Sequence, residues 1–383
     1  MRLTLVLPLL LTLGLGCGFL RGEGDELPLD EGCQPILGLQ SRSVRTTLGT
    51  ATVQADVPPF ARSLMLSARS EPGTYLFVER VLAPDGSVVA SSSDWQSQTE
   101  FLSSALLVLG EEANLNWPVR DIDPALTGGE WTFELTVLSS SGQYLDDEPI
   151  RTTLFINRDV DEGEGCLSAQ VLMSPATAAD PALDEAVRQA VARWQEVYAQ
   201  AGVQVSARFG TAEALPETLD HPYLGSDLYE TIKSEAQDEE LVMVIGESVA
   251  GASTGILGEA GGIPGSLAPA RRAVVGVGWL LHAGADGSFD DTDIDGLGET
   301  MAHEIGHYVG LFHPIELDSS GRPSGYTDAL TDTPDCDSST DCLNALGTNL
   351  MYPYRTCYDA NCTRQDLLTA QQEAVIRGYT GSR

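Results

Sequence analysis

Residues 298–314 read GETMAHEIGHYVGLFHP, and the spacing of their histidines is the strongest signal in the chain. His303 and His307 are separated so that, on a helix, they lie on the same face about one turn from each other. Gly310 can adopt backbone angles that other residues resist, which ends the helix and returns the chain towards His313. Three imidazoles placed in this way bind one zinc ion and leave a coordination position open, as in catalytic zinc sites.

Glu304 follows the first histidine and can contact water at such an ion without binding the ion itself. The spacing HExxHxxGxxH is filled without a mismatch, and it holds three of the 5 histidines in the chain. HExxH alone arises by chance fairly often, but the added glycine and third histidine make coincidence rare. We therefore expect a catalytic zinc site with Glu304 as general base. The other two histidines, His221 and His282, stand alone in the sequence and are expected to be structural or exposed.

With these motifs, residues 166–383 resemble the metzincin clan of zinc peptidases, and the resemblance does not extend to the residues before them. A tight turn with a methionine, downstream of the zinc helix, is a second feature of that clan, and NLMYPY at 349–354 matches it. The resemblance implies that Met351 forms a packed floor beneath the zinc ligands. It also implies that an extended peptide pairs with an edge strand above the zinc helix. Tyr352 and Tyr354 are candidates for stabilising the oxyanion.

Within the clan, the sequence is most similar to pappalysins. The segments that carry this likeness are DTPDC at 332–336, the cysteines around the methionine turn, and LTAQQEAVIRGY at 368–379. Pro314 is instead typical of serralysins, and the LMYP turn resembles that of matrixins. The resemblance implies a zinc-dependent endopeptidase that acts on proteins or peptides, in which zinc activates water and Glu304 takes its proton.

The acidic loop before the zinc helix suggests a second cation. Asp291, Asp293 and Asp295 repeat the first half of a calcium loop, but the last ligand position falls on Ala302, which rules out an EF-hand. Two interpretations remain, an irregular calcium site and a solvated acidic loop that caps the start of the helix. The pappalysin likeness also implies calcium near three later carboxylates, those of Asp328, Asp332 and Asp335.

Residues 1–17 have the features of an export signal. Arg2 supplies a positive charge, and the apolar run that follows is too short to span a bilayer comfortably. Leu15-Gly16-Cys17 resembles the end of a bacterial lipoprotein signal, which predicts a lipid anchor at Cys17. The alternative is plain secretion after cleavage near residues 18–22. Both alternatives predict an exported protein, either a lipoprotein of the bacterial outer membrane or cell surface or an extracellular protein.

Cysteine usage fits export. The chain has 7 cysteines, so six remain for disulfides in an oxidising compartment if Cys17 is lipidated. A disulfide between Cys33 and Cys166 would tie together the ends of the segment between them. The alternative is that Cys33 is a thiol that caps the zinc in an inactive precursor. The late cysteines allow three pairings among Cys336, Cys342, Cys357 and Cys362.

The chain is expected to be multidomain. Residues 18–35 are rich in glycine and acidic residues, which predicts a flexible tether. Residues 36–160 hold short alternating segments between turn signals, which predicts an all-β sandwich. This segment has no histidine, so a second histidine-based site is excluded there. Buried strands and an amphipathic helix at 180–200 then predict an α/β (α+β), metzincin-like zinc peptidase domain over residues 166–383.

Composition limits the partners. The 383 residues are 42% hydrophobic and 20% charged, as in globular proteins. A net charge of -35 argues against nucleic acid and against anionic membrane surfaces, so contact with a membrane is expected only through a lipid anchor. The oligomeric state is not indicated. The rival function is a non-catalytic surface lipoprotein whose β-sandwich binds a partner, and the intact Glu304 argues against it. Another alternative keeps the enzyme and makes the β-sandwich an inhibitory pro-segment.

Overall fold

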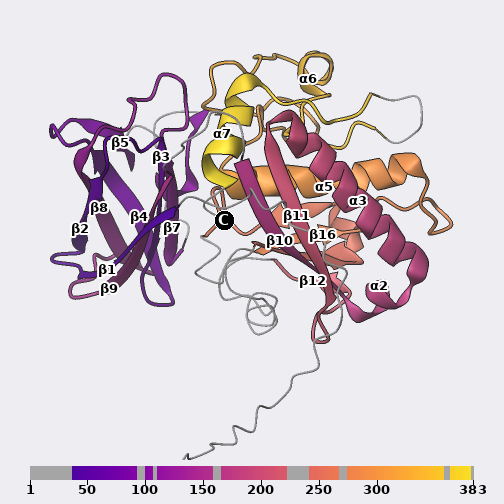
Figure 1. Ribbon diagram of the computed structural model, residues 1–383, viewed down its shortest axis with the longest axis horizontal. Coiled ribbons are helices and arrows are strands. Elements are labelled where there is room, and N and C mark those ends of the chain that lie inside the picture. The colour runs from indigo at the N-terminus through magenta and orange to yellow at the C-terminus, as the bar shows by residue number, and fades with distance from the viewer. Residues whose placement is uncertain are drawn as a thin grey trace, which may run out of the picture.

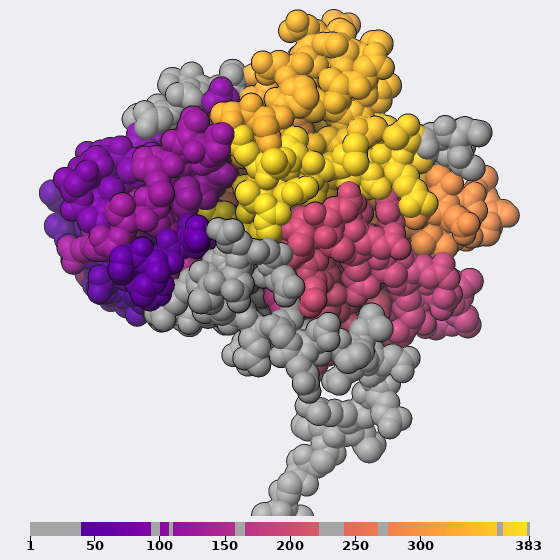
Figure 2. Space-filling view, turned by 45° about the horizontal axis from the view of Figure 1, so that its top comes forward, coloured from indigo at the N-terminus to yellow at the C-terminus, as the bar shows by residue number. Residues whose placement is uncertain are grey.

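The computed structural model describes residues 37–92, 100–106, 110–157, 165–221, 241–266, 274–357 and 363–380. Figure 1 shows a part built of strands beside a part in which helices accompany a sheet. We call them the β region (residues 37–157) and the α/β region (residues 165–380). Figure 2 shows the β region in direct contact with the orange and yellow residues of the α/β region. The predicted export signal, the lipidation site Cys17, the acidic tether and Cys33 lie outside the described residues.

The β region consists of two four-stranded antiparallel sheets. One has the order β1 (Leu37–Arg45), β9 (Pro149–Asn157), β3 (Ser63–Arg69) and β7 (Glu112–Trp117). The other has the order β2 (Thr50–Val57), β8 (Gly129–Ser139), β4 (Thr74–Leu82) and β5 (Val88–Ser91). Burial alternates strictly along β2, as expected of a strand with one face in the core. Leu66, Trp131 and Phe133 belong to the hydrophobic cluster of this region. The two sheets have the antiparallel pattern that the alternating sequence predicted.

The α/β region contains a five-stranded sheet. Its order is β11 (Val203–Thr211), β10 (Gly165–Met173), β13 (Leu241–Gly246), β16 (Val274–Gly278) and β15 (Gly258–Ala260). All neighbours pair in parallel except β15, which runs antiparallel to β16 at one edge. Every residue of β13 is buried, as expected of a central strand covered on both faces. The short strands β12 (Thr218–Leu219) and β14 (Ser248–Val249) pair with each other beside this sheet.

The helices of this region are α2 (Pro175–Ala179), α3 (Pro181–Gln200), α5 (Asp291–Val309), α6 (Ser339–Leu346) and α7 (Ala370–Thr380). Asp180 caps the start of α3, and its carboxylate accepts hydrogen bonds from the backbone N–H groups of Ala182 and Leu183. Helices α3, α5 and α7 share one large hydrophobic cluster with the sheet. In Figure 1, α7 lies between the β region and this sheet. No helix in the described part of the chain is long and apolar enough to cross a membrane.

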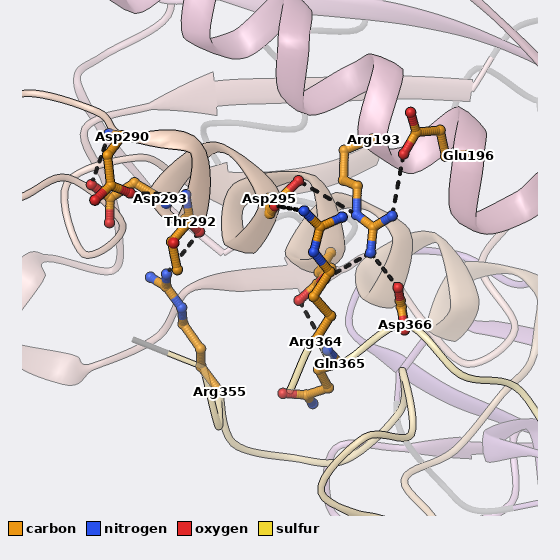
Figure 3. A network of polar contacts seen from close by, with 11 residues as sticks. Arg193, Glu196, Asp290, Thr292, Asp293, Asp295, Arg355, Arg364, Gln365 and Asp366 are labelled. Atoms are coloured by element: carbon orange, nitrogen blue, oxygen red, sulfur yellow. Dashed lines mark hydrogen bonds and ion pairs between the residues drawn. The ribbon is translucent and has the colours of Figure 1, made fainter. Parts of the chain in front are cut away.

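A buried arginine ties α3 to α5 (Figure 3). The Arg193 guanidinium lies 3.1 Å from Glu299 of α5 and also contacts Asp366, ahead of α7. Burial alone would lower the pKa of Arg193, but the hydrogen bonds to Asp366 and Glu299 outweigh it and raise the pKa. Breaking one partner of such a buried pair leaves an uncompensated charge, so this contact fixes α5 relative to α3.

The late cysteines are partly resolved. Cys336 and Cys342 form a disulfide bond, which excludes two of the three predicted pairings. Cys166 and Cys357 each take part in a disulfide bond as well. The division of the chain into domains, with boundaries near residues 160 and 166, stays a prediction.

Candidate metal centre

The three predicted ligands converge. His303 and His307 project from α5, and His313 follows the turn that ends this helix. The Nε2 atom of His313 lies 3.2 Å from that of His303 and 3.0 Å from that of His307. The candidate ligand atoms all lie within 4.8 Å of one another, and among the described residues this is the one such cluster of potential metal ligands.

The other nitrogen of each ring is held by an oxygen acceptor. Nδ1 lies 2.7 Å from the Leu350 carbonyl in His303 and 2.7 Å from the Leu311 carbonyl in His307. In His313 it lies 2.9 Å from Oε1 of Glu316. Because these acceptors carry no hydrogen, Nδ1 carries the proton and each Nε2 presents its lone pair to the common centre. This donor set fits a zinc ion, which binds neutral imidazole nitrogens oriented by hydrogen bonds of this kind.

Burial keeps the helical imidazoles neutral. It lowers the pKa of His303 to about 3, with a further contribution from His313. The pKa of His307 is likewise well below its usual value, first because of burial and then because of the neighbouring histidines. Metal binding requires the neutral form, so the helical rings need not lose a proton when they bind an ion near neutral pH.

Gly310 makes the predicted turn. Its φ of 117° lies in the region that L side chains rarely adopt, and its N–H donates to the carbonyls of Gly306 and His307. A Cβ at this position would also lie 2.6 Å from Nδ2 of Asn116 in the β region. Both the backbone angle and the available space therefore require glycine where the chain turns back towards His313.

Met351 lies directly against α5, the helix that carries His303 and His307. A Cβ on Gly306 would be 2.6 Å from its sulfur, so the sulfur occupies the space that this glycine leaves beside the helix. Met351 is fully buried, and its N–H donates to Oδ1 of Asn349. Leu350, whose carbonyl accepts from His303, belongs to the same turn. The structure thus places the predicted methionine turn beside the helix that carries two of the ligands.

Glu304 is buried beneath the edge strand β15. A Cβ on Gly258 would lie 2.5 Å from its Cγ, so only a glycine lets the strand come this close. Burial raises the pKa of Glu304 to about 8, Glu259 adds to the shift, and the backbone N–H of Ala260 opposes it. A cation bound at the histidines would favour the ionised carboxylate and lower this pKa.

Calcium at the predicted loop gains no support. Asp293 forms a capping box with Asp290 at the start of α5, and Asp295 forms ion pairs with Arg193 and Arg364 (Figure 3). Asp291 lies in the first turn of the helix. The structure therefore agrees with the alternative of an acidic loop that caps the helix, and the described carboxylates do not gather into a metal site there.

The two predicted oxyanion residues, Tyr352 and Tyr354, have different surroundings. The Tyr352 ring packs in a small hydrophobic cluster with Ile315 and Leu346 and is 4% exposed. The Tyr354 hydroxyl donates to the carbonyl of Asp318, 3.4 Å away. Burial raises the pKa of Tyr352. These contacts give no support to an oxyanion role for either ring.

The two remaining histidines have structural partners. His282 is buried and accepts a hydrogen bond from Arg355 at 3.2 Å. Burial, followed by the Arg355 charge, lowers the pKa of His282 to about 3. His221 lies at the surface with Nδ1 2.6 Å from Glu259, whose hydrogen bond raises the pKa of His221. Both fit the structural or exposed role that was expected.

Three contributors to the site were not identified from the sequence. Glu316 orients His313, and Glu259 lies on the strand above Glu304. Asn116 contacts the end of the zinc helix from the β region. A carboxylate three residues after a predicted ligand was the available signal for Glu316, whereas the other two become visible only in the folded chain.

The sequence matches no protein-family model and no curated protein. Metalloproteinase-II from Bacteroides fragilis is similar in structure, with 12% sequence identity, a TM-score of 0.33, and coverage of 58% of this chain and 61% of that chain. Archaemetzincin from Methanopyrus kandleri has 14% identity, a TM-score of 0.35, and coverage of 57% and 98% respectively. This chain spans less than two thirds of the Bacteroides protein. Since identities and TM-scores are low, the function proposed below rests on the site. The finer resemblance to pappalysins gains no support here and stays a prediction.

Proposed function

We propose that this chain is a metal-dependent hydrolase whose metal ion is held by His303, His307 and His313. The observation that supports this proposal best is the convergence of three Nε2 atoms whose rings are each fixed by a hydrogen bond at Nδ1. We infer further that the metal is zinc and that the chain is an endopeptidase of the metzincin type. The methionine turn beside the zinc helix and the edge strand over Glu304 support this finer assignment.

The residues around the centre suit peptide hydrolysis. When bound, zinc supplies Lewis-acid chemistry that polarises a carbonyl and promotes the ionisation of water. Glu304 takes a proton from the attacking water and later gives it to the leaving amine. The edge strand β15 offers backbone groups to an extended peptide, which would lie across the carboxylate. Met351 keeps a packing role beneath the helical ligands.

We also propose that the chain is exported, as its first residues predict. Support comes from the disulfide between Cys336 and Cys342, since such bonds persist in oxidising compartments. Lipidation at Cys17 and the pappalysin-like subtype belong to this proposal as well. Mass spectrometry of the mature N-terminus separates the lipid anchor from plain secretion.

The experiment that tests the function combines hydrolysis with metal analysis. The purified chain is expected to contain one zinc ion and to cleave casein or a quenched peptide library, and a chelator should abolish cleavage. Glu304→Gln keeps the size of the side chain and removes the base, so kcat should fall by about 10²–10⁴-fold while zinc stays bound. Glu304→Ala should have a similar effect.

Two outcomes would contradict the proposal. Full activity of Glu304→Gln would remove this residue from its role as base. A chain that binds one zinc ion and cleaves none of the peptides would instead favour a non-catalytic surface lipoprotein whose β region binds a partner.

A further inference from the structure

We propose that the β region is a positioning element of the metal site, in which Asn116 and Phe101 hold the turn that presents His313. This inference rests on the proposed metal centre and concerns the third ligand alone. The two helical ligands both project from α5, whereas His313 lies beyond the helix end. The β region contacts the chain on both sides of His313.

The first contact is made by Asn116 of β7. Its Nδ2 donates to the carbonyl of Val309, the last residue of α5, at 2.7 Å. Carbonyls in the last turn of a helix lack a partner within the helix, so a side chain from elsewhere satisfies this one. Asn116 is 2% exposed and faces Gly310 so closely that a Cβ there would touch its nitrogen. The turn is thereby fixed where it begins.

The second contact is a stack of aromatic rings. β6 (Glu100–Phe101) places the Phe101 ring 5.3 Å from that of Phe312, at an interplanar angle of 23°. The Phe101 ring also stacks on Tyr326, at 5.4 Å and 12°. Stacked pairs of this kind stabilise a contact beyond the apolar area that they bury. Because Phe312 directly precedes His313, the stack restrains the backbone that carries the ligand.

The third contact involves the chain that follows His313. β6 pairs in parallel with β17 (Thr327–Asp328), and the N–H of Ala329 donates to the Phe101 carbonyl. The segment before β17 folds back on itself, since the N–H of Glu316 donates to the Tyr326 carbonyl at 2.7 Å. Glu316 is the residue that accepts from His313 Nδ1. Strand pairing with the β region therefore holds the segment that orients the imidazole.

These contacts oppose the interpretation of the β region as a removable pro-segment. Its removal would expose the Val309 carbonyl, the Phe312 ring and one edge of β17 together. The helical histidines would keep their acceptors, but His313 would lose the surroundings that fix its turn. We therefore expect zinc affinity, and not only folding, to depend on the β region.

The test measures zinc affinity of the full chain by competition with a chromophoric chelator. Asn116→Ala and Phe101→Ala are expected to weaken zinc binding by about tenfold, the lower end of the range seen when outer partners of metal ligands are lost. Phe101→Tyr, which keeps the ring, should restore most of the affinity. Thermal unfolding and circular dichroism of the metal-free chains report whether each variant is folded.

Two controls separate positioning from general loss of stability. Asn114→Ala changes the same residue type on the same strand, and Phe133→Leu weakens the core on the sheet farther from the metal site (Figure 1). Both should bind zinc within about twofold of the unmodified chain. Should Phe101→Ala fail to fold, Phe101→Leu, which keeps apolar volume and loses the stack, gives the same test.

The outcomes distinguish this inference from the proposed function. Folded Asn116→Ala and Phe101→Ala chains that bind zinc as tightly as the unmodified chain would overturn the positioning role. Equal weakening by Phe133→Leu would do so too. An unmodified chain that binds zinc but cleaves no peptide would overturn the peptidase proposal alone, and one that binds no zinc would overturn both.

Discussion

Helix α5 and the segment that follows it hold their histidines in different ways. On α5, His303 and His307 are placed by helical geometry, and their Nδ1 atoms find backbone carbonyls of neighbouring turns. After Gly310, His313 depends on the Glu316 carboxylate and on packing from the β region. The positions of two ligands thus follow from one helix, and the position of the third depends on tertiary structure. The difference predicts that the two kinds of ligand respond differently to mutation.

The largest expected effect comes from removing the ligands themselves. His313→Ala and His307→Ala should each lower zinc affinity by more than about a hundredfold, since a ligand contributes more than the outer partners do. The metal-free chains should differ, however. His307 is 7% exposed within the core side of α5, so His307→Ala should also lower the free energy of unfolding by about 1–3 kcal/mol through its lost hydrogen bond.

His313→Ala should leave the metal-free stability close to that of the unmodified chain, because the His313 side chain is 20% exposed and outside the helix. Zinc titration and denaturant unfolding in the presence of a chelator measure the two quantities. Equal destabilisation of both metal-free variants would break the distinction between helical and loop ligands.

The junction between the two segments is expected to be the next most sensitive point. Gly310→Ala forces a φ of 117° on a residue with a side chain and places its Cβ 2.6 Å from Asn116 Nδ2, so stability should fall by about 1–3 kcal/mol. Gly321→Ala is the matched control, because its φ is 74° with nothing within 4 Å of the added carbon.

Gly321→Ala should therefore report the cost of the backbone angle alone, about 1 kcal/mol. Combining Gly310→Ala with Asn116→Ala should remove the steric part of the Gly310→Ala effect. Thermal unfolding of Gly310→Ala, Gly321→Ala, Asn116→Ala and the double variant measures the backbone and steric contributions. A Gly310→Ala effect no larger than that of Gly321→Ala would show that Asn116 does not confine the turn.

The smallest expected effect concerns the Glu316 side chain. Glu316→Ala removes the acceptor that orients His313 and should weaken zinc binding by about tenfold, the lower end of the usual range. Glu316→Gln keeps an oxygen acceptor without the charge and should weaken binding less. Chelator competition resolves differences of this size. Wild-type affinity in Glu316→Ala would mean that packing alone orients the third ligand.

The sequence predicted those parts of the site that depend on residues close together in the chain. The spacing of His303 and His307 follows from helical periodicity, and Gly310 follows from the need to reverse the chain. The methionine turn was found through a family resemblance. The strand-rich N-terminal part followed from alternation along short segments such as residues 131–137, which lie within β8.

Contacts between distant residues could not be predicted. Asn116 and Val309 are 193 residues apart, and nothing local to either residue signals their hydrogen bond. Gly258–Ala260 lie in a glycine-rich stretch without a local strand signal, yet they form an edge strand, because pairing with β16 outweighs the weak strand propensity of glycine. The choice between a calcium site and a helix cap also depended on a distant residue. Asp295 pairs with Arg193, a residue of another helix that local spacing could not reveal.

Gly258 has a consequence for how this chain can diversify. A Cβ at this position would lie 2.5 Å from Cγ of Glu304, so any other residue would push the strand away from this side chain. A new substrate preference is therefore expected to arise at positions other than 258, and a change at Glu259 would also alter the pKa of Glu304, which the Glu259 charge helps to raise.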